Sequence, residues 1–197
     1  MATQKQRSGE TRLKLLNAFR AAFLERGYDD TPVQSVLDQT GLSKGALYHH
    51  FRSKSEIIEA LFEHESRSTI ERVLSRLDPE ISALARLRMA CVEWTKEVRA
   101  PDISKILFEI GPSALGARKA KQIEDRFSLS QIEALLNEAA AAREIEVSEP
   151  KLIAAFLNAL VAEAGLFYLR TGTDSAPTLA ASIDALFASM AARPFSE

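Results

Sequence analysis

The sequence contains a single cysteine, Cys91, among 197 residues. A lone thiol cannot form an intramolecular disulfide, so the chain fits a reducing compartment, and we expect a cytoplasmic protein. The first ten residues are polar and lack the apolar run of a secretory signal. Both absences argue against a secreted protein held together by disulfides.

Strand patterns are also missing, because no stretch alternates β-branched and polar residues between hairpin turns. Apolar residues instead recur at helical spacing, which predicts an all-α fold. We expect three helices before Phe51. Asp78-Pro79 has the pattern of a helix start. The remaining helices are expected over residues 54–77, 80–99, 103–111, 116–143, 150–170 and 177–192.

Long apolar runs are scarce. The uncharged stretch Leu152–Ala162 is followed by Glu163 and is shorter than the ~20 apolar residues that cross a bilayer. We therefore expect no membrane partner.

No motif typical of an enzyme is present. There is no P-loop, dinucleotide fingerprint, nucleophile elbow or helical carboxylate–histidine spacing, so no reaction can be named and no cofactor is expected. His49, His50 and His64 are the histidines available to a metal. Adjacent histidines point apart on a helix and no cysteine or carboxylate completes a ligand set, so we expect no metal site.

The net charge of −2 is not evenly distributed along the chain. Residues 1–60 hold 9 Lys and Arg against 7 Asp and Glu, which leaves 16 against 20 for the remainder. The sign fits a nucleic-acid-binding N-terminal segment on an acidic body.

The segment from Gly27 to Ile58 carries the clearest local signals. Gly27 can end a first helix, and Thr31-Pro32-Val33-Gln34 has the pattern of a capping box that starts a second. Gly41-Leu42-Ser43 then predicts a tight turn, an apolar plug and a new N-cap. Two short helices around such a turn are typical of a helix-turn-helix. Ser53-Lys54-Ser55-Glu56 is a second capping box, which begins a long helix.

On the helix after the turn, Lys44, Gly45, Tyr48 and His49 share one side, whereas Leu47, His50 and Phe51 face the other. Glycine costs a helix ~1 kcal/mol relative to alanine, and close approach to DNA would compensate. Lys54 begins a helix, where its charge and the dipole both attract a phosphate. The alternatives are solvated lysines and a tyrosine that only packs.

At these residues the chain resembles the TetR family of bacterial transcriptional regulators. The matching segments are Phe23–Tyr28, Gly41–Gly45 and Leu47–Lys54, with mild departures at Val36, Leu37, Thr40 and Ile57. The resemblance implies DNA contacts at Gln34, Lys44, Gly45, Ala46, Tyr48, His49 and Lys54. It also implies a DNA-binding domain over residues 1–55 and a helical ligand-binding and dimerisation domain over residues 56–197.

The function that follows is a homodimeric regulator, not an enzyme, which binds a palindromic operator on double-stranded DNA. Its two helices at 44–50 would enter successive major grooves ~34–36 Å apart. A small-molecule effector would favour a different spacing and release the DNA. The family usually represses by blocking the promoter, so the resemblance implies repression, with activation as the alternative. A constitutive DNA-binding protein and a helical-bundle enzyme remain the alternatives.

Three aromatic residues from different C-terminal helices could surround an effector: Trp94, Phe108 and Phe127. Arg118 and Glu163 are the candidate polar partners. Plain core packing is the alternative explanation for the aromatic residues. Cys91 shares an apolar stripe with Trp94 and is interpreted as a small buried residue.

The last two expected helices are predicted to form the dimer interface. The first is apolar around nearly its whole circumference, which requires burial on all sides, and a copy of the same hairpin could supply it. The candidate interface residues are Phe156, Leu160, Phe167, Ile183, Leu186 and Phe187. Enclosure of the helix by its own subunit is the alternative.

Overall fold

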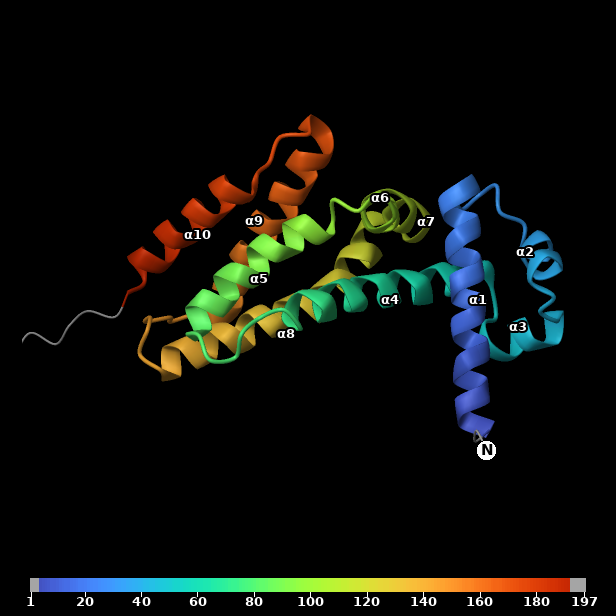
Figure 1. The fold of residues 1–197 in the computed structure, drawn as a ribbon, viewed down its shortest axis with the longest axis horizontal. Coiled ribbons are helices and arrows are strands. Elements are labelled where there is room, and N and C mark those ends of the chain that lie inside the picture. The colour runs from blue at the N-terminus through green and yellow to red at the C-terminus, as the bar shows by residue number, and fades with distance from the viewer. Residues whose placement is uncertain (1–3, 192–197) are drawn as a thin grey trace, which may run out of the picture. The chain divides into compact units, whose positions relative to one another are not determined.

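The computed structural model describes residues 4–191, and within that range it contains helices and no strand (Figure 1). The all-α prediction is confirmed. Contacts divide the chain into two compact units. The first comprises the chain up to residue 65 together with residues 105–123. The second comprises residues 66–104 and the chain from residue 124 onward.

The first unit is built around α1 (Gln4–Arg26), α2 (Val33–Thr40), α3 (Lys44–His50) and the first part of α4 (Lys54–Leu74). Apolar residues on one stripe of α1 meet those of α2, α3 and α4 in a common core. Its largest fully buried side chains are Leu15, Leu16, Phe19, Phe23, Leu47, Phe51, Ile57, Ile58 and Leu61. This core holds α2 and α3 in place and leaves their other faces exposed.

The single helix expected over residues 103–111 is wrong. The chain forms α6 (Pro101–Ser104), a π-helix η1 (Lys105–Ile110) and α7 (Gly111–Leu115). Where η1 meets α7, a Cβ on Gly111 would lie 2.1 Å from a ring carbon of Phe62, so only glycine fits there. Lys105 Nζ donates a 2.6 Å hydrogen bond to the carbonyl of Leu24. Residues 105–123 therefore belong to the first unit.

The second unit packs α5 (Ala83–Glu97) against α9 (Pro150–Thr171) and α10 (Ala176–Ser189), with the later parts of α4 and α8 (Ala117–Ala141). The predicted helix start at Asp78-Pro79 is wrong. Ser82 is the N-cap, its Oγ accepts from Ala85 N, and the carboxylate of Glu144 accepts from the N–H groups of Ala83 and Leu84. Caps that satisfy these free N–H groups decide where α5 begins.

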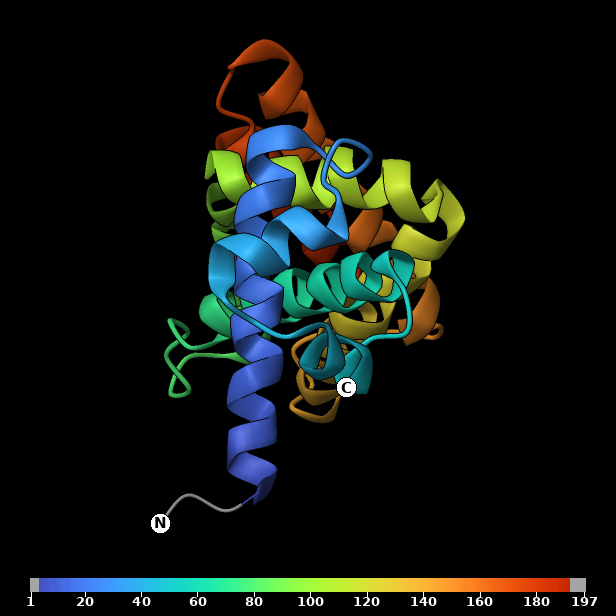
Figure 2. The ribbon, with the colours of Figure 1, turned by 90° about the vertical axis from the view of Figure 1, so that its right-hand side faces the viewer.

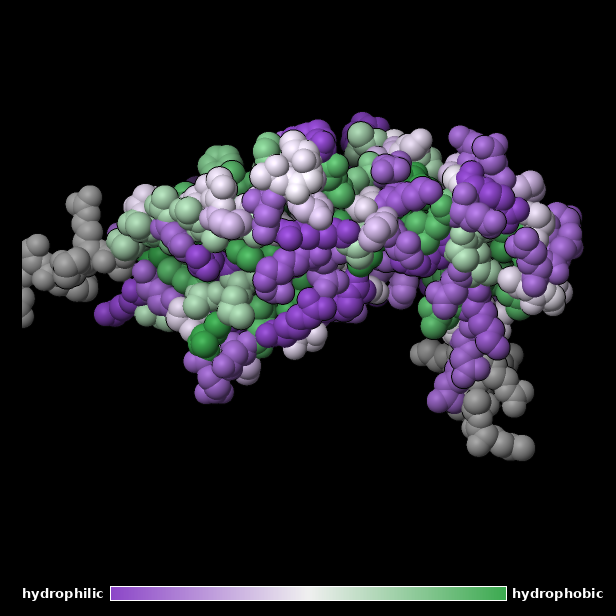
Figure 3. Space-filling model, turned by 45° about the horizontal axis from the view of Figure 1, so that its top comes forward, coloured by the Kyte–Doolittle hydropathy of each residue, from purple (hydrophilic) through white to green (hydrophobic). Residues whose placement is uncertain are grey.

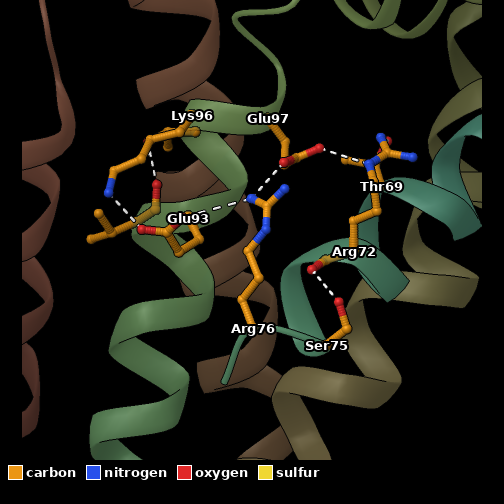
Figure 4. A network of polar contacts seen from close by, with 9 residues as sticks. Thr69, Arg72, Ser75, Arg76, Glu93, Lys96 and Glu97 are labelled. Carbon is orange, nitrogen blue, oxygen red and sulfur yellow. Dashed lines mark hydrogen bonds and ion pairs between the residues drawn. The ribbon is translucent and has the colours of Figure 1, made fainter. Parts of the chain in front are cut away.

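A polar network joins the second half of α4 to α5 (Figure 4). Glu97 accepts from Arg72 Nε at 2.8 Å and pairs with Arg76 at 2.6 Å. Burial raises the pKa of Glu97, but the hydrogen bonds and charges of the two arginines outweigh it and hold that pKa below the ordinary value. The network holds the two helices together through charge as well as apolar packing.

Helix α9 contradicts the expectation that its apolar stretch is too short to cross a bilayer. It is 22 residues long, has a mean hydropathy of 1.9 over 18 residues, and is therefore long and apolar enough to cross a membrane by length and composition. A single helix of this kind is weak evidence for a membrane span, because a helix that packs against protein passes the same test. In this structure Ala154, Leu157, Val161 and Gly165 are buried.

Candidate DNA interface

The loop between α1 and α2 is closed by side-chain hydrogen bonds. Gly27 ends α1 with φ +82°, as predicted. Thr31 is fully buried, and its hydroxyl donates to the carbonyls of Gly27 at 2.6 Å and Ala22 at 3.2 Å. The predicted capping box at Thr31 is wrong, because this hydroxyl closes the end of α1 and makes no cap on α2. These hydrogen bonds therefore fix the position of the start of α2 relative to the end of α1.

The turn between α2 and α3 agrees with the sequence analysis. Gly41 has φ +65°, a left-handed conformation that favours glycine. Leu42 packs against the core of the first unit. Ser43 Oγ accepts a 3.0 Å hydrogen bond from Ala46 N and so caps α3. These contacts confirm the predicted helix-turn-helix.

Helix α3 has one buried side and one exposed side. Leu47 and Phe51 are 1% exposed and anchor the helix, whereas Tyr48 is 51% exposed and Lys44 and His49 also face outward. The predicted division of the helix is confirmed. A cation, a phenol hydroxyl and an imidazole thus stand together on a helix held firmly from behind, and such groups can bind phosphates and base edges.

No side chain in the part of the chain that the structure describes packs closely against Gly45. A Cβ placed there would meet only Ser43 Oγ, at an ordinary 3.9 Å, and the residue is exposed. Alanine would favour the helix more. The folded chain itself therefore does not require a glycine at this position. The half-buried Ala46 follows it.

Two predicted contact residues already have partners within the chain. Gln34 is exposed, and its Nε2 donates to Asp38 Oδ1 at 2.8 Å. Lys54 Nζ donates to the carbonyl of Asp29 at 3.2 Å and lies 4.4 Å from the ring centroid of Tyr28. An ammonium has three donors, so this contact leaves Lys54 able to donate further.

The end of α3 has an electrostatic neighbour that sequence reasoning missed. The guanidinium of Arg12, on α1, lies 5.2 Å from the ring centroid of Phe51. Burial, and then the charges of His49 and Arg12, lower the pKa of His50, so the charged form of this imidazole is disfavoured. The spacing offers a signal for Arg12: it stands four residues before Leu16 on the apolar stripe of α1.

The candidate effector residues occupy varied surroundings. In the second unit, Trp94 is half-buried beside Gly165, whose Cβ, if present, would lie 3.1 Å from the indole. Phe127 has the guanidinium of Arg67 5.0 Å from its ring centroid, and Glu163 is exposed and pairs with Arg170. In the first unit, Phe108 is half-buried and Arg118 exposed. A pocket formed by these five residues stays a prediction.

A cavity of about 340 Å³ lies elsewhere in the second unit. Its lining is mainly apolar, with Arg86, Gln131 and Glu138 as the polar members. The apolar members are Leu74, Leu77, Pro79, Ala134 and Leu135. Its volume falls at the lower end of the range for small-molecule sites.

The candidate dimer residues fall into two groups. Ile183 and Phe187 are 0% and 8% exposed in the core of their own subunit, and the half-buried Leu186 packs against that core. Ile183 and Phe187 belong to a core cluster with residues of α5 and α9, so little of either side chain is left for a partner, and their place in an interface stays a prediction. Enclosure by the chain itself explains these residues of α10.

The other three candidates lie on the uncovered side of α9. Phe156 is 51%, Phe167 42% and Leu160 40% exposed, and Leu152 and Leu169 are exposed as well. Exposed large apolar side chains on one helix mark a surface that another protein can cover. The uncovered side of α9 is thus available to another protein chain.

Comparisons with known proteins agree with this geometry. Residues 15–61 match the model for bacterial regulatory proteins of the tetR family, and residues 84–191 match the model for a tetracyclin repressor-like C-terminal domain. The HTH-type transcriptional regulator TtgR of Pseudomonas putida is 29% identical over 96 residues, 48% of this chain and 45% of that protein. The match thus spans less than half of that relative.

Solved structures share the fold over nearly the whole chain. A TetR-family transcriptional regulator from Pectobacterium atrosepticum has a TM-score of 0.76 and 25% identity, and the match covers 98% of this chain and 100% of that one. The transcriptional regulator FadR from Bacillus subtilis, in complex with stearoyl-CoA, has a TM-score of 0.68 and 18% identity, with 90% and 97% covered.

Proposed function

Because the chain belongs to the TetR family of bacterial transcriptional regulators, we propose that it is a cytoplasmic repressor that binds a palindromic operator as a dimer and is released by a small molecule. The exposed face of α3 carries this proposal, since Lys44, Tyr48 and His49 stand together on a helix anchored by Leu47 and Phe51. We assign DNA binding to residues 1–55, and effector binding and dimerisation to residues 56–197.

Each contact residue has a role that its chemistry supports. Lys44 donates to a guanine edge or a phosphate, and the Tyr48 hydroxyl and His49 donate to phosphates. Gly45 and Ala46 let the backbone approach the groove wall, which accounts for a glycine that the folded chain does not require. Gln34 and Lys54 contact phosphates from the starts of α2 and α4.

The dimer forms through the uncovered side of α9. Phe156, Leu160 and Phe167 would pack against the same residues of a second copy, in a two-fold interface. The exposed side of α10 offers small residues, among them Ala181, Ala185 and Ala188, beside which a partner helix can lie close. A two-fold dimer explains why a palindrome is read.

The effector binds in the second unit. FadR, which shares the fold, is in complex with stearoyl-CoA in its solved structure, so a protein of this fold can bind such a ligand. Two sites are candidates in this chain: the surroundings of Trp94 and the cavity beside Arg86. Helix α4 begins with Lys54 and continues into the second unit, so a ligand that moves its later turns can change the spacing of the two α3 helices.

Selection of bound duplexes from a random pool with the purified protein tests this function. We expect the selected duplexes to share a palindromic consensus. The fraction of DNA bound should depend on protein concentration as it does when two chains bind one palindrome, and some members of a metabolite panel should release the DNA. Tryptophan fluorescence then tests the Trp94 site, because Trp94 is the single tryptophan. A protein that enriches no sequence would contradict the proposal, and binding that no compound releases would support a constitutive DNA-binding protein.

A further inference from the structure

We propose that the DNA interface extends beyond the helix-turn-helix: the first turns of α1, residues 4–14, bind backbone phosphates beside the site that α3 reads, through the helix face that carries Arg12. This inference rests on the proposed function, since it needs a DNA duplex to which the protein binds. It adds a surface that does not belong to α2, α3 or the start of α4.

Helix α1 begins well before its core. Its first buried residue is Leu15, and the preceding eleven residues make about three turns. Gln6, Glu10, Arg12, Leu13 and Lys14 are exposed. Figure 2 shows these turns running on past α2 and α3, and in Figure 3 the visible surface of this end of α1 is hydrophilic. Among the described side chains of this extension, Leu13 is the one large apolar residue, and it is 46% exposed.

The extension holds the positive charge of the N-terminal third. Residues 1–14 contain Lys5, Arg7, Arg12 and Lys14 against the single acid Glu10. Residues 15–60 contain five basic and six acidic residues. The small positive balance of the first 60 residues therefore comes entirely from these turns, and a dense anion such as DNA is the partner that such a segment attracts.

A side-chain contact places this extension next to the C-terminal end of α3. The guanidinium of Arg12 lies 5.2 Å from the ring centroid of Phe51, which is the C-cap of α3. Its charge also reaches the imidazole of His50. Arg12 thus lies beside the C-terminal end of α3, which a duplex held against Lys44, Tyr48 and His49 would pass.

The two sides of the extension differ, and this difference gives the test a matched control. Arg12 stands on the side of α1 that faces Phe51. Lys14 follows Arg12 by two residues, about 200° around the helix, and is exposed on the opposite side. The Arg12 side is the one that lies next to α3, so we place the phosphate contact there and not at Lys14.

A contact of this kind has a defined signature. An arginine on a phosphate adds affinity that does not depend on sequence, and it releases a bound counterion, so its loss lowers the slope of log K against log salt by about 0.9. An arginine that only supports α3 would, when removed, lower affinity at every salt concentration with an unchanged slope.

The experiment measures binding of Arg12→Gln, Lys14→Gln and wild type to the selected operator over a salt series, by fluorescence anisotropy. The duplex is used in two lengths, one with flanking base pairs and one trimmed to the palindrome. On the long duplex we expect Arg12→Gln to bind about tenfold more weakly at low salt, with a slope lower by about one per half-site. Lys14→Gln should bind as wild type, and Arg12→Lys should recover most of the slope.

On the trimmed duplex the difference between Arg12→Gln and wild type should shrink, because the flanking phosphates are gone. Equal slopes for Arg12→Gln and wild type, or equal losses for Arg12→Gln and Lys14→Gln, would overturn the proposal. Thermal unfolding of each variant shows that it is folded at the assay temperature. Wild type that binds no selected duplex would instead overturn the proposed function, so the two failures are distinguishable.

Discussion

Tyr48 is 51% exposed on a helix that the buried Leu47 and Phe51 anchor from behind. Tyr48→Phe removes the phenol hydroxyl and leaves the packing intact. We expect DNA affinity to fall about tenfold, about 1.4 kcal/mol, for specific and unrelated duplexes alike, since a phosphate contact carries no sequence information. Tyr168→Phe, on α9, is the matched control and should bind as wild type in a mobility-shift assay. Unchanged affinity for Tyr48→Phe would remove this hydroxyl from the interface.

Cys91 is a residue whose burial decides its chemistry. It is 4% exposed in the core of the second unit, and burial raises the pKa of its thiol to about 12. The thiolate is the reactive form, so a disulfide reagent at neutral pH should modify the native protein very slowly and the denatured protein rapidly. Absorbance of the released thiol measures both rates. Rapid modification of the native protein would show that the core opens readily around this residue.

At the scale of elements, the π-helix η1 depends on Gly111. A Cβ at that position would lie 2.1 Å from the ring of Phe62 and 2.9 Å from the carbonyl of Ile106, so Gly111→Ala forces side chains or backbone apart. We expect a loss of ~1–3 kcal/mol, or several degrees in the unfolding temperature. Gly9→Ala is the matched control, because that exposed helical glycine has nothing within 4 Å, and it should leave stability unchanged or slightly raised.

The contact between α4 and α5 depends on charge as well as apolar packing. The pKa of Glu97 is below its ordinary value in the folded protein, so its contribution is present at neutral pH and is lost as the pH falls through that lowered value. We expect Glu97→Gln to lower the unfolding temperature by ~2–4 °C at neutral pH, and by less in strong acid or high salt. Glu163→Gln, which breaks the exposed pair with Arg170, should have little effect. A deficit that does not change with pH would assign the role of Glu97 to packing alone.

For the whole molecule, association through α9 and stability within one subunit can be separated by position. Leu160→Glu places a charge on the uncovered side of α9, so we expect a folded monomer whose affinity for the palindrome is greatly reduced. Ile183→Glu places the charge in the core of the subunit and should unfold it. Analytical ultracentrifugation and circular dichroism distinguish the two results. A Leu160→Glu variant that remains dimeric at micromolar concentration would exclude this face.

The helix-turn-helix could be predicted from sequence because local interactions specify it. The left-handed glycine at Gly41, the Ser43 cap and the alternation of Leu47 and Tyr48 each concern a few neighbouring residues, and the structure has them as predicted. Thr31 is the exception: its hydroxyl turns back to the end of α1, where a buried donor finds two carbonyls.

The sequence by itself thus determined the helical class, the helix-turn-helix and which side of α3 is exposed, because caps, turns and helical periodicity act over a few residues. Tertiary structure alone decided that Ile183 and Phe187 lie in the subunit core while Phe156 and Leu160 stay exposed. Helical periodicity shows which apolar residues share a face, but it does not show which other helix that face packs against. It also placed residues 105–123 in the first unit, Lys54 against Tyr28, and Arg12 beside Phe51, because contacts between distant segments depend on how the helices pack.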